Sequence, residues 1–182
     1  MATWVLLLRA VNLGATNKVS MPVLRELMAD AGFTDVRTYV QSGNIVATSK
    51  HRSEAAVAKD LRALIKEHFD VDTPVIVRTP RQVAAVVKSN PFPAEVEASE
   101  KLVAVVFHDK PLPKDSSVVE FADSAGEKVL VDGRELYIAY SSSIHQSKLT
   151  AAAMRKHLGA IEGTARNWRT VKAVAELAAA SD

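Results

Sequence analysis

The chain has 182 residues, of which 48% are apolar and 24% are charged, a balance typical of folded proteins with one large or two small domains. The net charge of +2 gives no overall basic field for nucleic acid or an anionic membrane. The lack of cysteine excludes disulfides, thiolate metal sites, iron–sulfur clusters and a cysteine nucleophile. No apolar run approaches the ~20 residues of a membrane span, so we expect a soluble cytoplasmic protein without a membrane partner.

A strand and a helix are predicted first. Residues 4–11 form a nearly continuous apolar run, typical of a central strand that is covered on both faces. After a polar loop, Ser20 stands where it can cap a helix, and Gly32 stands where a left-handed residue can end it.

A hairpin is predicted next, and polar side chains precede its turn. Apolar and polar residues alternate over 36–41, which indicates a half-buried strand, and residues 45–48 form the second strand. Gly43-Asn44 lies between them and supplies the positive backbone angles of a tight turn. Gln41 and Ser42 lead into this turn, so we interpret it as a candidate binding site.

Three further elements complete a first half. A helix begins at Ser53, residues 75–77 form a short strand, and Thr79 with Gln82 forms a capping box at the start of another helix. The order is strand, helix, strand, strand, helix, strand and one more helix, which is the order of a ferredoxin-like unit.

The same order repeats after an acidic, proline-containing linker. The second half comprises a strand over 102–107, a short helix over 116–121, hairpin strands over 128–131 and 135–140 joined at Asp132-Gly133, and helices over 149–158 and 168–180. Residues 78–86 also resemble residues 166–174 at a constant offset. We therefore predict an α+β fold of duplicated ferredoxin-like halves with antiparallel sheets: 1–90, a linker over 91–100, and 101–182.

The loop over residues 9–18 is one candidate anion site. It joins a strand to a helix N-terminus, and Arg9 and Lys18 add positive charge. It has a single glycine and lacks the spacing of a phosphate-binding loop. A structural interpretation is also open, in which Asn12 and Asn17 stabilise turns.

The segment 166–169 is a second candidate. Asn167 matches Thr79 in the repeat and is predicted to cap the last helix, with Trp168 in its first turn. Arg166 and Arg169 place two guanidinium groups beside that helix terminus, an arrangement suited to a carboxylate or phosphate. The two interpretations are compatible.

Other chemistry finds less support in the sequence. The five histidines do not converge. His145, near Lys148, is the one that could act as a general base, but a solvated loop is the favoured interpretation of this segment. No metal-binding spacing is present, so we expect no metal, and no cofactor is indicated. Aromatic residues are only 5% of the chain, which disfavours base stacking on a sheet without excluding nucleic acid.

Four motifs in order resemble the bacterial domain-of-unknown-function family 1697. They are Arg9-Ala-Val-Asn12-Leu-Gly14 with Asn17-Lys18-Val19-Ser-Met21, Tyr39-Val-Gln41-Ser42-Gly43-Asn44, Ser147-Lys148-Leu149, and Thr164-Ala-Arg166-Asn167-Trp168-Arg-Thr170-Val171. The resemblance covers nearly the whole chain and implies a duplicated α+β fold, with no established activity, substrate or cofactor. Ala165 departs from the family, which usually has a threonine there.

These observations lead to a hypothesis of a binding module. We expect an anionic small molecule or nucleotide in a cleft between the halves. Its candidate ligand-binding residues are Arg9, Asn12, Lys18, Gln41, Ser42, Asn44, Lys148, Arg166, Asn167 and Trp168. The alternatives are an enzyme acting on a phosphorylated or carboxylated small molecule, and a nucleic-acid-binding protein, while the oligomeric state is left open.

The ferredoxin-like order also yields an expectation about geometry. We expect the first strand–helix loop and the first hairpin turn at opposite ends of the sheet, so that Lys18 and Asn44 do not meet. The turn at Gly43 is then expected near Arg78, and the turn at Gly133 near Arg166.

Overall fold

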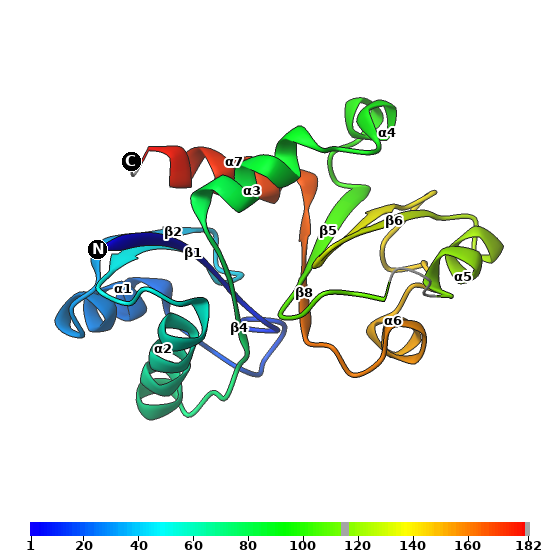
Figure 1. Cartoon of the computed structure of the whole chain (residues 1–182). Helices are drawn as coiled ribbons and strands as arrows, with labels where there is room; N and C mark the ends of the chain where they lie inside the picture. The colour runs from blue at the N-terminus through cyan, green and yellow to red at the C-terminus, as the bar shows by residue number, and fades with distance from the viewer. Residues whose placement is uncertain (114–116, 181–182) are drawn as a thin grey trace. The chain divides into compact units, whose positions relative to one another are not determined.

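The computed structural model describes residues 1–113 and 117–180 (Figure 1). Its first half runs through β1 (Ala2–Leu8), α1 (Met21–Asp30), β2 (Thr34–Tyr39), β3 (Asn44–Ser49), α2 (Glu54–Phe69), β4 (Val75–Arg78) and α3 (Pro80–Lys88). The short helix α4 (Pro93–Ala98) follows. The second half runs through β5 (Val103–His108), α5 (Val118–Ser124), β6 (Lys128–Asp132), β7 (Glu135–Ala139), α6 (Ala151–Leu158), β8 (Gly163–Asn167) and α7 (Trp168–Ala179).

The two sheets have the same topology. Their strand orders are β2-β3-β1-β4 and β6-β7-β5-β8, and all the pairings are antiparallel. This is the order of the ferredoxin-like βαββαβ unit, in which the first strand is central and the fourth strand pairs with it on the outer side. The predicted α+β fold of duplicated ferredoxin-like halves is confirmed.

The core of the first half lies between its sheet and two helices. Trp4, Leu6 and Leu8 alternate along β1 and pack in one buried cluster with residues of α1 and α2. Figure 1 shows both helices on the same face of this sheet. The intervening residues of β1, Val5 and Leu7, are also buried, which explains the continuous apolar run in the sequence.

The second half repeats this arrangement with shorter helices. Ala104 and Val106 of β5 pack with Ile138 of β7, Val118 of α5 and Leu158 of α6 in a second buried cluster. Helix α6 has 8 residues where its counterpart α2 has 16, and α5 has 7 where α1 has 10. The second half therefore keeps the sheet topology of the first with less helical cover.

The chain forms two compact units that do not coincide with a simple division of the sequence. One unit contains Met1–Val87 together with the chain from Lys172 onward, and the other contains Lys88–Val171. Helix α7 therefore begins in the second unit and continues into the first.

Capping hydrogen bonds explain where several of the helices begin. The Ser53 hydroxyl accepts a hydrogen bond from Ala56 N at 3.2 Å, and the Asn167 side chain accepts one from Thr170 N at 2.9 Å. Thr79 N donates to Gln82 Oε1 at 2.7 Å while Gln82 N donates to Thr79 Oγ1 at 3.2 Å, so the predicted capping box is present.

The hairpin turns differ from the sequence-based expectation. Tyr39 pairs with Asn44, so the first loop has four residues, Val40 to Gly43, and Asn44 belongs to β3. Asp132 pairs with Glu135, so the second turn is Gly133-Arg134. Glycine at the first central position is the requirement of the mirror-image type II turn, in contrast to the Asp-Gly turn that we expected.

Three smaller differences concern which elements are present and where they begin. The segment 91–100, predicted as a linker, contains α4. Ser116, where a helix was predicted to begin, lies outside the described residues, and α5 begins at Val118. Strand β8 was not predicted. Its buried residues, Thr164 and Arg166, alternate with less buried ones, so the sequence shows no apolar run there.

Candidate functional site

The first strand–helix loop and the first hairpin loop lie at the same end of the sheet, so the opposite-ends expectation was wrong. Helix α1 returns the chain to the starting end, so β2 runs in the direction of β1, and β3 starts beside the end of β1. Leu8 N donates to Gly43 O at 2.8 Å. We call residues 9–20 and 40–43 the loop–hairpin end.

The expected neighbours of the two arginines were wrong for the same reason. Strand β4 is antiparallel to β1, so Val75 pairs with Leu8 near the loop–hairpin end and Arg78 pairs with Val5 farther away. In the second half, His108 N donates to Arg134 O beside the hairpin turn, whereas Arg166 pairs with Val105.

Asn12 joins the two loops through its side chain. Its Nδ2 donates to Val19 O at 2.8 Å and to Gln41 O at 2.7 Å, and its Oδ1 accepts from Val19 N at 2.9 Å. One amide group therefore closes the loop before α1 and holds the hairpin loop against it. Each such bond contributes about 1 kcal/mol, so Asn12 is a structural residue of this end.

Asn44 and Ser42 fix the hairpin loop from inside. The Asn44 side chain is fully buried, and its Nδ2 donates to Tyr39 O at 3.0 Å and to Ser42 Oγ at 2.9 Å. Gln41 is exposed and Ser42 is half-buried. Of these three predicted residues, Gln41 and Ser42 face solvent in part, and Asn44 positions them.

The backbone of this end is strained. Among the described residues, six non-glycine residues have positive φ, and four of them, Ala10, Asn12, Asn17 and Val40, lie in these two loops. The left-handed conformation costs roughly 1–2 kcal/mol for a residue that is not glycine, and it is rarest for a β-branched residue such as Val40. Strain that is retained in this way is often found at functional sites.

The N-terminus of α1 opens onto this end without a side-chain cap. Ser20 occupies the N-cap position, but its hydroxyl makes no capping hydrogen bond, and the first turn of α1 has no acidic residue. Lys18 is exposed and its side chain has no hydrogen-bond or ion-pair partner in the described part of the chain. Arg9 is half-buried, and Thr73 Oγ1 donates to Arg9 O at 2.6 Å, which anchors its backbone.

The predicted cluster at the start of α7 is largely buried. Arg166 is 8% exposed and donates through Nη1 to Thr164 Oγ1 at 2.7 Å and to Ala165 O at 2.8 Å. Burial lowers the pKa of Arg166 to about 10. Trp168 is buried and Asn167 caps the helix, so these three residues support the structure around the one exposed member, Arg169. The hydroxyl beside Arg166 belongs to Thr164, while Ala165 is exposed.

Lys148 and His145 lie in the exposed loop that follows β7. Neither side chain makes a hydrogen bond or an ion pair with another described residue. Nothing in the loop orients His145 toward a nucleophile, and the loop provides charge without a fixed geometry.

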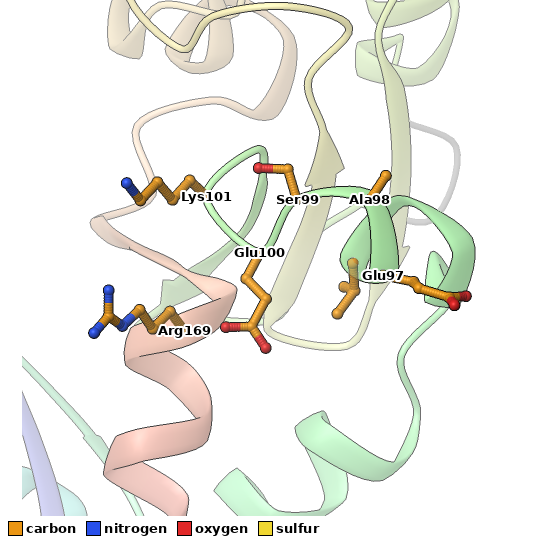
Figure 2. A pocket seen from close by; sticks show the side chains of 7 residues that line it. Glu97, Ala98, Ser99, Glu100, Lys101 and Arg169 are labelled. Carbon is orange, nitrogen blue, oxygen red and sulfur yellow. The ribbon is translucent and has the colours of Figure 1, made fainter.

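A pocket of about 650 Å³ lies in the second unit beside α4 and the first turn of α7 (Figure 2). It is lined by Val96, Glu97, Ala98, Ser99, Glu100, Lys101 and Arg169. The sequence had placed most of these residues in a solvated acidic linker. Two features of the sequence could have indicated this pocket. Pro93 is placed to begin a helix, and Lys101 is a lone cation after the acidic run.

No three of the described histidine, cysteine, aspartate and glutamate residues are grouped so that they could hold a metal ion. None of the helices that the structure describes is both long and apolar enough to cross a membrane.

Comparison with known proteins identifies the family. Residues 1–137 match the family described as protein of unknown function DUF1697. The chain belongs to this family. The match ends before Lys148, so the last two of the four sequence motifs lie outside it. No curated protein matches the chain.

A solved structure shares the fold of this DUF1697 protein. The conserved bacterial protein SP0830 from Streptococcus pneumoniae is 22% identical and superposes with a TM-score of 0.72, and the match covers 97% of this chain and 98% of that one. At this identity the likeness establishes the fold alone.

Proposed function

We propose that this DUF1697 protein binds an anionic small molecule or a nucleotide at the loop–hairpin end of its first unit. The observation that carries the proposal is the uncapped N-terminus of α1 beside Lys18. The proposal includes the bacterial, cytoplasmic setting that we expected from the sequence.

The electrostatics of this end favour a negative ligand. The first amide groups of a helix and the positive end of its dipole attract anions, typically by about 0.3–1 kcal/mol at an exposed site. Here Pro22 has no N–H, but the other amide groups of the first turn receive no hydrogen bond from the Ser20 hydroxyl, and no acidic side chain competes there. Lys18 adds a cation that has no partner among the described side chains. An anion would supply the missing negative charge.

The hairpin loop supplies polar groups on the adjacent side. Asn12 Nδ2 bonds both Val19 O and Gln41 O, so the segment before α1 and the exposed Gln41 are held close together. Because the hydrogen bonds of Asn12 and Asn44 fix both loops, little ordering entropy would be lost when a ligand binds. A ligand larger than phosphate, such as a nucleotide, could contact the Gln41 amide and the Ser42 hydroxyl in addition to the helix terminus.

The test is a thermal-shift titration with inorganic phosphate, pyrophosphate, AMP and ATP. A ligand at a hundred times its Kd stabilises the folded state by about 2.7 kcal/mol, which raises Tm by roughly 5–10 °C for a chain of this size. We expect this shift for at least one probe in the wild type and its loss in Lys18→Gln. Lys50→Gln, which changes an exposed lysine at the other end of β3, is the matched control and should keep the shift. A wild type that responds to no probe, or a Lys18→Gln variant that responds equally, would contradict the proposal.

A further inference from the structure

The terminal strand β6 of the second sheet is regular enough to pair with a further strand. It ends the order β6-β7-β5-β8, and each of its residues pairs with β7 without a shift in register. The terminal strand β2 of the first sheet differs, because its register with β3 shifts between Thr34 and Arg37. Such irregularities hinder pairing at a sheet edge. We propose that two copies of the chain associate through their β6 strands, paired antiparallel.

The hairpin geometry determines which main-chain groups of β6 point outward. The turn between β6 and β7 has two residues, so the closing pair, Asp132 with Glu135, is hydrogen-bonded. Hydrogen-bonded positions alternate along an antiparallel pair, so the N–H and C=O groups of Val129 and Val131 point away from β7. Neither valine forms another main-chain hydrogen bond with residues 1–113 or 117–180. These groups are the ones that a second strand would bond.

One register satisfies both valines at once. If Val129 of one copy lies opposite Val131 of the other, each of the two resulting pairs exchanges both of its main-chain hydrogen bonds across a two-fold axis. Leu130 then lies opposite Leu130 of the second copy, and Lys128 lies opposite Asp132. A shift by two residues in either direction would place one of the valines opposite a residue outside β6, so this register gives the most hydrogen bonds.

The charges of β6 are complementary in this register. Lys128 and Asp132 are exposed at opposite ends of the strand, so antiparallel pairing places each beside the opposite charge of the second copy. Opposite charges directly across a strand pair are favourable, and like charges are unfavourable. Lys128 Nζ already donates to Glu95 Oε1 at 2.5 Å, but an ammonium group has three donors and can also donate to Asp132 of the second copy.

The pairing would also cover apolar surface. Leu130 is 41% exposed and lies between the two charges on the same face of β6. Val129 and Val131 are half-buried and pack from the other face against the core of the second unit. In the dimer, Leu130 contacts its counterpart and each valine contacts the other valine, a favoured cross-strand combination. Because the strands are short, the interface is small, and we expect a Kd in the micromolar to millimolar range.

Charge-reversal variants test the pairing and its register. Asp132→Lys gives β6 two lysines and Lys128→Asp gives it two aspartates, so each variant should associate with itself at least tenfold more weakly than the wild type. An equimolar mixture of the two variants restores opposite charges at both ends and should form a heterodimer. Analytical ultracentrifugation of the full chain from roughly 10 µM to 1 mM measures these affinities.

The control for these variants is Lys50→Asp, which reverses an exposed charge in the first unit and should dimerise as the wild type does. A wild type that is monomeric at 1 mM, at the weak end of the expected range, would overturn the proposal. A mixture that associates no more than its separate components would overturn it as well. The loop–hairpin end takes no part, so the result is independent of the anion titration.

The lack of cysteine in the chain permits a second test, at the two-fold axis. Leu130→Cys places the thiols of two copies at a non-hydrogen-bonded pair, where the Cα atoms lie about 4.5 Å apart and a disulfide can form. Lys110→Cys is the control, because Lys110 is an exposed residue of the same unit outside β6. Mild oxidation should cross-link Leu130→Cys much faster than Lys110→Cys. Equal rates would contradict the position of the axis.

Discussion

Single residues decide the conformation of the first hairpin loop. Gly43 has a φ of +76°, and a Cβ added to it would lie 2.5 Å from Leu8 Cβ, on the central strand β1. Gly133 in the second hairpin also has positive φ, but a Cβ there would meet nothing within 4 Å. The two glycines therefore share a backbone requirement and differ in their steric one.

This difference predicts unequal effects of the same substitution. Gly133→Ala should cost roughly 1–2 kcal/mol, the price of a left-handed non-glycine residue alone. Gly43→Ala should cost about 3 kcal/mol or more, since overpacking is added to that strain. Urea denaturation of both variants measures the two free energies of unfolding. Equal losses would show that β1 relaxes around the new methyl group.

At the scale of elements, the helix starts differ in what their first residues do. Ser53 and Ser20 both occupy N-cap positions, but only the hydroxyl of Ser53 accepts a hydrogen bond from its helix. Helices α4 and α5 also begin without a side-chain cap, but α1 differs from both because its first turn has no acidic residue. We propose that an anion binds at this terminus.

The two serines provide a matched pair of variants. Ser53→Ala should lower the free energy of unfolding by about 1 kcal/mol, which is the usual cost of a lost cap. Ser20→Ala should lower it by only about 0.3 kcal/mol, because no capping hydrogen bond is lost. Denaturation in anion-free buffer provides the measurement. A loss at Ser20 as large as the loss at Ser53 would mean that its hydroxyl caps α1 after all.

Helix α4 is attached to β6 by an ion pair that responds to pH. The Lys128 ammonium group lowers the pKa of the half-buried Glu95 from its ordinary 4.5. A lowered pKa stabilises the fold above the unfolded value of 4.5, and this contribution disappears as the pH falls through the lowered value. Glu95→Gln should therefore be less stable than the wild type at pH 7 and equal to it at strongly acidic pH. Denaturation at several pH values checks this, and 1 M salt should shrink the difference because the pair is partly exposed.

At the scale of the whole molecule, duplication has preserved the sheets more closely than their connections. Both units keep the same strand order, but the first hairpin loop has four residues and the second has two. The cluster of residues with positive φ at the loop–hairpin end belongs to the first unit, as does the uncapped terminus of α1, whose first turn has no acidic residue. The α4 pocket belongs to the second. The two halves share an architecture and differ in the sites that their loops offer.

Above pH 10, the free energy of unfolding should depend on the ionisation of a buried tyrosine side chain. Burial, with a contribution from the nearby Glu127 carboxylate, raises the pKa of Tyr140 to about 12. The neutral phenol stabilises the fold fully below the unfolded pKa of 10, and this stabilisation is lost as the pH rises through 12. Between these values the wild type should lose about 2 kcal/mol more than Tyr140→Phe. Denaturation at pH 9 and 11.5 tests this, with Tyr39→Phe as the control for loss of a phenol.

Local features were predictable because they depend on residues that are close in sequence. The strand at β1 and the helix caps at Ser53, Thr79 and Asn167 were all predicted correctly. The turn residues were not, because the pairing register of Tyr39 with Asn44 and of Asp132 with Glu135 is set by contacts across the sheet. Strand β8 was missed as a separate element because it holds Arg166 at a buried position where the sequence suggests a surface residue.

The sequence by itself determined the element order, the duplication, the family resemblance and the polar segments that could form a site. The element order, the duplication and the polar segments follow from period and local spacing, and the resemblance to the family comes from four motifs in order. Only the tertiary structure decided which segments meet: antiparallel pairing brings the loop after β1 to the hairpin loop, where Asn12 joins them. It also buried Asn44, Arg166 and Trp168 and left Lys18 and Arg169 at the surface. Which side chains are buried and which segments lie close together depend on how parts of the chain that are distant in sequence pack against one another. A local sequence pattern does not contain that information.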